Sequence, residues 1–73
     1  MVVFNRITFD PAILGGRACI RGMRIPVSVI VKHIAYGAAR EDIVNENPDL
    51  ELEDVQQALE YAAWLTGEEV RTA

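Results

Sequence analysis

Residues 15–27 constrain the fold of this chain more than any other stretch. Gly15 and Gly16 can both adopt positive φ without a Cβ clash, so the chain can reverse direction there. Residues 17–21 read Arg-Ala-Cys-Ile-Arg, and we interpret their alternation as the two-residue period of a β-strand. Gly22 interrupts that period, and Pro26 disfavours helix at the residue before it. The stretch therefore predicts a turn, a basic strand, a second turn and a helix that begins after Pro26.

The alternation also assigns faces to the predicted strand. Ala18 and Ile20 are expected on one face, and the other face carries Arg17, Cys19 and Arg21.

Residues 2–9 are rich in β-branched and aromatic side chains and predict a first strand, antiparallel to the second. Between the strands, Asp10 and Pro11 open a turn, with Asp10 as its cap. A two-stranded ribbon by itself is marginally stable and has exposed edges. We therefore expect ribbons from two chains to pair in a homodimer.

The remainder of the chain predicts three helices, over residues 27–36, 40–46 and 52–65. Gly37 and Gly67 follow the first and third helices, where a residue in the left-handed conformation commonly ends a helix. The apolar residues expected to face the core are Ile30, Val31 and Ile34 in the first helix, Ile43 and Val44 in the second, and Leu52, Val55, Leu59 and Ala62 or Ala63 in the third.

This order of elements predicts a mostly α-helical fold with a small N-terminal β-ribbon. The helices have the layout of a trihelical helix-turn-helix, although any three-helix bundle shares it. With 73 residues, we expect a single domain over 1–73. It would comprise a ribbon arm (1–26), the three helices (27–66) and a tail (67–73).

The composition favours a folded cytoplasmic protein. Hydrophobic residues make up 51% of the chain, too many for a disordered protein. We find no apolar run long enough to cross a membrane and no signal peptide. Cys19 is the single cysteine, so the sequence predicts no internal disulfide.

Charge is distributed unevenly along the chain. The net charge of −4 combines a balance of +5 over residues 1–40 with −9 over residues 41–73. An acidic chain is a poor candidate for nucleic-acid binding overall, but a basic face can still bind nucleic acid locally. The acidic half is equally suited to a basic protein partner.

The basic residues of the first half are the nucleic-acid-binding candidates, because arginine suits bidentate contact with phosphate. They are Arg6, Arg17, Arg21, Arg24, Lys32 and Arg40. The alternative is that these side chains are solvated or paired with acids of the C-terminal half.

Two aromatic and two acidic residues near the C-terminus are the partner-binding candidates. Tyr61 and Trp64 are three residues apart on the third helix, so they share a face, in the core or at an interface. Glu68 and Glu69 add acidic charge beyond that helix.

We expect no enzymatic activity, metal or cofactor. His33 has no other ligand at metal-binding spacing, and Cys19 has no histidine or aspartate constellation around it. The acids Glu51, Glu53 and Asp54 are expected to be helix-surface charges rather than a convergent catalytic pair.

Many turn and helix-boundary residues resemble the domain-of-unknown-function 433 family in order and spacing over residues 6–64. The matching residues are Ile7-Thr8-Phe9-Asp10-Pro11, Gly15-Gly16, Ile20-Arg21-Gly22, Arg24-Ile25-Pro26-Val27, Gly37, Ile43, Asn47-Pro48, Leu50 and Asp54-Val55. The resemblance implies a homeodomain-like helix-turn-helix fold. It also implies a dimeric, antitoxin-like protein, related to VapB-type antitoxins, that is encoded beside a PIN-like ribonuclease.

Some positions depart from the family pattern. Ala39 and Glu51 stand where the family commonly has serine or threonine caps, and losing a good cap costs about 0.5–2 kcal/mol. The acids that open the third helix would face DNA phosphates with the wrong charge if this helix entered the major groove.

Three functions stay open at this point. The first is an antitoxin that neutralises a PIN-like ribonuclease and represses its own operon by binding operator DNA. The second is a stand-alone DNA-binding regulator. The third is a dimeric scaffold module with neither activity.

Overall fold

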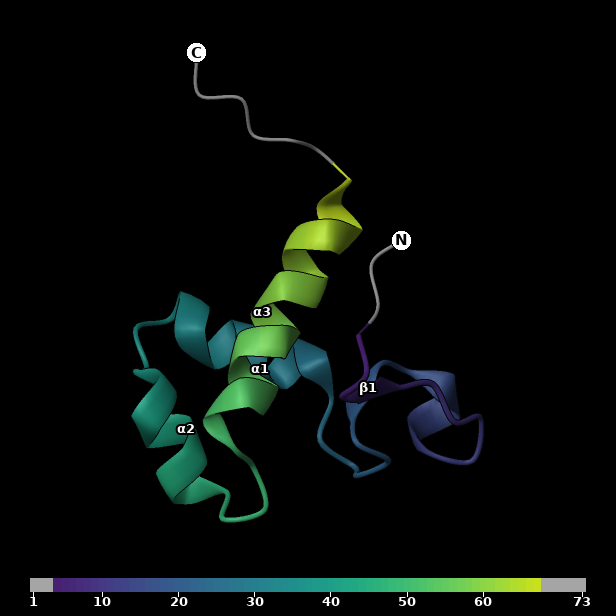
Figure 1. Ribbon diagram of the computed structural model, residues 1–73, viewed down its shortest axis with the longest axis horizontal. Coiled ribbons are helices and arrows are strands. Elements are labelled where there is room, and N and C mark those ends of the chain that lie inside the picture. Colours follow the sequence, from purple (N-terminus) through teal and green to yellow (C-terminus); the bar gives the residue numbers. More distant parts are fainter. Residues whose placement is uncertain (1–3, 68–73) are drawn as a thin grey trace.

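A computed structural model describes residues 4–67 and shows three helices beside a small N-terminal ribbon (Figure 1). The elements are β1 (Ile7–Thr8), the single 3-10 turn η1 (Leu14–Gly16), β2 (Cys19–Ile20), α1 (Val27–Ala35), α2 (Arg40–Glu46) and α3 (Leu52–Thr66). Helix α3 packs against both α1 and α2. The predicted mostly helical fold with an N-terminal ribbon is confirmed. Within residues 4–67, no helix combines the length and apolarity needed to cross a bilayer.

The ribbon is antiparallel, as predicted, but its strands are short. Ile7 pairs with Ile20, and Thr8 pairs with Cys19. Cys19 and Ile20, which were predicted on opposite faces of the strand, are both buried, at 1% and 0% exposed. Successive strand residues point to opposite faces, so both faces of β2 are covered.

The outer edge of β2 is occupied by the segment that leads into α1. The Ile20 N–H donates to the Ile25 carbonyl at 3.0 Å, and the Val27 N–H donates to the Ala18 carbonyl at 3.0 Å. A homodimer formed by strand pairing stays a prediction, and β2 has no free edge for it.

The helix boundaries agree closely with the sequence. Gly37 follows α1 with φ 101°, and Gly67 caps α3 in the left-handed conformation with φ 67°. Acids three residues into α2 and α3 partly replace the missing serine or threonine caps. The Ala39 N–H donates to Asp42 at 3.0 Å, and the Glu51 N–H donates to Asp54 at 2.8 Å.

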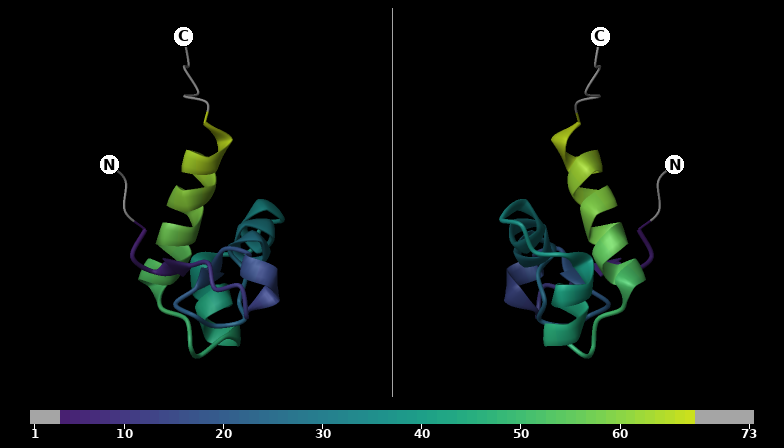
Figure 2. Two further views of the ribbon diagram at one scale, coloured as in Figure 1. Left: turned by 90° about the vertical axis from the view of Figure 1, so that its right-hand side faces the viewer. Right: turned by 90° about the vertical axis from the view of Figure 1, so that its left-hand side faces the viewer.

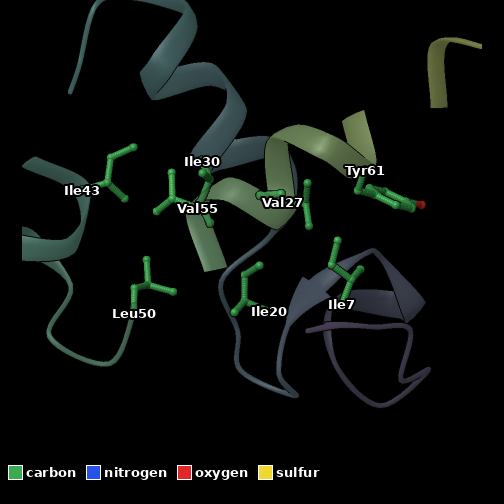
Figure 3. Packing of buried hydrophobic residues seen from close by; sticks show 9 residues of the cluster. Ile7, Ile20, Val27, Ile30, Ile43, Leu50, Val55 and Tyr61 are labelled. Atoms are coloured by element: carbon green, nitrogen blue, oxygen red, sulfur yellow. The ribbon is translucent and has the colours of Figure 1, made fainter. Parts of the chain in front are cut away.

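The core lies where α3 crosses α1 and the ribbon (Figure 3). Its buried apolar members are Ile7, Ile20, Val27, Ile30, Ile43, Leu50, Val55, Ala58 and Tyr61.

The buried face of α3 agrees with the predicted one at Val55 but differs at Leu52 and Asp54. Leu52 is 47% exposed, whereas the fully buried positions include Asp54 and Ala58. The prediction followed hydrophobicity alone and so missed Asp54, a carboxylate that is buried because it pairs with Arg6 and Arg21.

Candidate functional site

The N-terminal end of α3 carries a charged cluster, which we call the arginine–aspartate cluster and define as Arg6, Arg21 and Asp54. Asp54 is 0% exposed, and Arg21 binds it in a bidentate manner, with Nε–Oδ1 at 3.0 Å and NH2–Oδ2 at 2.8 Å. Arg6 donates to Asp54 Oδ1 at 2.8 Å and to Glu51 Oε1 at 2.8 Å. The cluster therefore links both sides of the ribbon to the start of α3.

The backbone aims these side chains at α3. Arg6 comes directly before β1, and its N–H donates to Gln57 of α3 at 2.6 Å. Arg21 comes directly after β2 with φ 44°, in the left-handed region that non-glycine residues rarely adopt. There its guanidinium also reaches the Asp49 carbonyl, at 2.7 Å. The strained residue thus sits where its side chain closes the cluster.

The cluster holds Asp54 ionised. Burial by itself would raise the pKa of Asp54, but hydrogen bonds from Arg21, Arg6 and the Glu51 backbone outweigh burial and lower that pKa to about 2. The side-chain hydrogen bonds with Glu51 and Asp54 raise the pKa of Arg6, and the bond with Asp54 raises the pKa of Arg21.

This arrangement corrects one prediction and qualifies another. Asp54 is a buried cluster residue rather than a helix-surface charge. Arg6 and Arg21 were nucleic-acid-binding candidates, and their guanidinium groups donate to acids of the C-terminal half instead, which is the alternative that the sequence left open. The signal missed in the sequence was an acid at the third position of α3, directly before the buried Val55.

The other basic candidates, Arg17, Arg24, Lys32 and Arg40, are exposed. Within residues 4–67, none of these four forms an ion pair. Arg17 and Lys32 both line one groove, whereas Arg24 and Arg40 are not among its lining residues.

That groove has a volume of about 380 Å³ and lies between α1, α3 and the segment before β2. We call it the α1–α3 groove. Its apolar lining comes from Ala18, Val27, Val31, Ala62 and Leu65, and its polar lining from Arg17, Ser28 and Lys32. The sequence did not predict it, because its α1 and α3 walls come from segments at least 30 positions apart in the numbering.

The two aromatic candidates lie in different environments. Tyr61 is 8% exposed and packs edge-on against Phe4, with ring centroids 5.3 Å apart, and against Phe9 at 5.9 Å. The rings of Trp64 and Phe4 have centroids 5.7 Å apart, but Trp64 is 55% exposed. Tyr61 thus completes the core, and Trp64 remains accessible to a partner. The partner-binding candidates Glu68 and Glu69 lie outside the described residues.

Metal-ligand geometry is not present in the described part of the chain: no three His, Cys, Asp or Glu residues there are placed to hold one ion. His33 is exposed on α1, and the Cys19 thiol of β2 is free and buried.

Comparisons with known proteins place the chain in a family. The family model described as "Protein of unknown function (DUF433)" matches residues 7–62. An uncharacterised protein, y4eO, from Sinorhizobium fredii (strain NBRC 101917 / NGR234), is 36% identical over 56 residues, which cover 77% of this chain and 25% of that protein.

The fold is also similar to a crystal structure of a DUF433 member from Anabaena variabilis ATCC 29413. The similarity has a TM-score of 0.79 at 33% identity and covers 86% of this chain and 62% of the other. The chain thus spans less than two thirds of either relative. Because the family model covers most of its length, the chain belongs to the DUF433 family of proteins of unknown function.

Proposed function

We propose that this chain is a non-catalytic binding protein of the antitoxin type, which neutralises a PIN-like ribonuclease in the cytoplasm by direct protein contact. The observation that carries the proposal is the C-terminal end of α3. There Trp64 and Leu65 are 55% and 58% exposed, and Leu65 lines the α1–α3 groove. Exposed tryptophan and leucine side chains at one end of a helix are typical of a protein-binding surface.

The charge arrangement supports protein binding over DNA recognition by α3. The N-cap Glu51 and the first-turn residues Glu53 and Asp54 place three acids at the start of α3, and Arg6 is within ion-pair distance of all three. A helix inserted into the major groove would bring these carboxylates close to phosphates.

Co-expression with the product of the neighbouring gene, followed by affinity pull-down and an RNase assay, tests the proposal. We expect a stable complex with suppressed RNase activity, and at least a roughly tenfold loss of affinity with Trp64→Ser. Tyr36→Ser is the matched control, because Tyr36 is an aromatic residue 81% exposed at the end of α1. A complex equally tight with both variants would remove the end of α3 from the interface.

Operator binding is the second candidate function, supported by the four exposed cations Arg17, Arg24, Lys32 and Arg40. It predicts DNA affinity that falls linearly with the logarithm of salt concentration. A DNA shift measured over several salt concentrations, together with sizing of the free protein, would test both operator binding and the proposed homodimer.

A further inference from the structure

The buried face of α3 continues beyond the body of the molecule. Val55 and Ala58 on this face are both fully buried, Ala62 is half-buried, and Leu65 is 58% exposed. These residues follow each other at helical spacings of three and four. Figures 1 and 2 show the C-terminal turns of α3 extending past α1. The apolar face of α3 therefore extends further along the helix than the elements that cover it.

The α1–α3 groove lies alongside this uncovered part of α3. Val27 and Val31 of α1 line it from one side and Leu65 lines it from α3, so the groove is an unfilled continuation of the core. Apolar side chains from another segment would bury this surface from water, which is favourable in proportion to the area covered.

Two cations give the groove a charge preference. Arg17 and Lys32 both line it, and neither forms an ion pair within residues 4–67. Among the described residues, the guanidinium of Arg17 donates only to the Ser28 hydroxyl, at 3.4 Å. Both cations lie at a locally basic site on a chain whose net charge is −4.

Within residues 4–67, a second copy paired through α3 and a nucleic acid each match the groove only in part. Glu60 is the acid of α3 nearest in sequence to Leu65, and five residues of helix rotate it about 140° away from Leu65. Two copies paired through this face would thus bring no α3 carboxylate to Arg17 and Lys32. A phosphate backbone would match the cations but leave the valine and leucine surface uncovered.

We propose that the α1–α3 groove binds a short acidic segment of a partner protein. Apolar side chains of that segment fill the space between Val31 and Leu65, and its carboxylates pair with Arg17 and Lys32. The inference rests on the proposed function in requiring a protein partner, and it assigns that partner's chemistry.

A random 12-residue peptide library displayed on phage and selected on the immobilised full chain provides the probe. We expect enriched peptides that combine aspartate or glutamate with leucine, isoleucine, valine or phenylalanine. The consensus peptide is then synthesised, and its affinity is measured by fluorescence anisotropy.

Charge reversal at the groove is the decisive variant. The double variant Arg17→Glu/Lys32→Glu is expected to weaken the peptide at least roughly tenfold. The control Arg24→Glu/Arg40→Glu makes the same change in net charge at exposed cations outside the groove lining. Leu65→Asp should also abolish binding, and thermal melts must show that each variant remains folded.

Other outcomes would overturn the proposal. These are no enrichment, a basic or uncharged consensus, or equal affinities for the groove variant and its control. Sizing that shows a homodimer dissociated by Leu65→Asp would assign the groove to a second copy. A ribonuclease complex that is indifferent to Arg17→Glu/Lys32→Glu would overturn the groove assignment alone. Peptide binding without any ribonuclease complex would instead overturn only the antitoxin function.

Discussion

The two ends of α3 are opposites in chemistry. At its first turn, the carboxylate of Asp54 is fully buried and receives donors from Arg6, Arg21 and the Glu51 backbone. At its last turn, Leu65 is apolar and 58% exposed. One end buries charge, and the other exposes hydrocarbon to water.

This contrast distinguishes residues that hold the fold together from residues that are available to a partner. A buried charge is tolerated only when it is paired and hydrogen-bonded, so the polar end is internally complete. An exposed apolar surface remains unfavourable until something covers it. Charged residues in this chain are thus poor guides to the binding site where they are paired, and the uncovered end of α3 is a better one.

Removing the buried carboxylate at the polar end of α3 should cause the largest loss of folding stability. Asp54→Ala is expected to destabilise the fold by about 3 kcal/mol, because it leaves two arginines without their shared partner and α3 without its N-terminal acceptor. Urea unfolding at neutral pH measures the loss. Glu53→Ala is the control, with an expected cost below about 0.5 kcal/mol, because the Glu53 side chain is 73% exposed. Equal costs would show that the cluster contributes no more than a surface ion pair.

Acid should weaken the polar end through the same carboxylate. The pKa of Asp54 is about 2 in the folded chain, against 3.8 for the ordinary group. The folded pKa is the lower one, so its stabilisation is complete above about pH 4–5 and is lost as pH falls toward 2. The difference corresponds to about 2 kcal/mol.

Urea unfolding between pH 5 and pH 2, compared with Asp54→Asn, isolates this contribution. Between pH 5 and pH 2, the free energy of unfolding of the variant should fall by about 2 kcal/mol less than that of the wild type. Parallel pH profiles for the two proteins would contradict the shifted pKa.

Truncating one apolar residue at each end of α3 compares how much buried and exposed apolar side chains contribute to stability. Val55→Ala removes fully buried methyl groups and should cost about 2 kcal/mol, including the cavity that it leaves. Leu65→Ala should cost less than about 0.5 kcal/mol, because its side chain is exposed. Thermal melts of both variants test this, and a larger loss for Leu65→Ala would mean that its surface is already covered in the free protein.

The smallest expected effect concerns Trp64, the single tryptophan of the chain. Because Trp64 is 55% exposed, acrylamide should quench its fluorescence readily in the folded protein. Quenching should decrease when a partner binds the end of α3. A folded chain whose tryptophan is shielded from acrylamide would indicate a buried position, contrary to the structure.

Helix boundaries could be predicted well from the sequence, and so could the antiparallel ribbon. Gly37 and Gly67 act through local backbone geometry, which does not depend on distant parts of the chain. The buried face of α3 could not be predicted in the same way. Leu52 was expected inside and Asp54 outside, and the structure reverses both.

The candidate site was predicted only in part. Trp64 could be singled out as a large aromatic at the end of a helix. The α1–α3 groove could not, because no local pattern relates Arg17 to Lys32 or to Leu65.

The sequence by itself determined where each element begins and ends, and it carried enough turn residues to identify the DUF433 family. Only the tertiary structure decided which charges are paired. Ionic partners such as Arg21 and Asp54 are 33 positions apart. Their pairing depends on how the ribbon docks against α3, because Coulomb attraction and desolvation follow distance in space, whereas helix caps and turns follow distance along the chain.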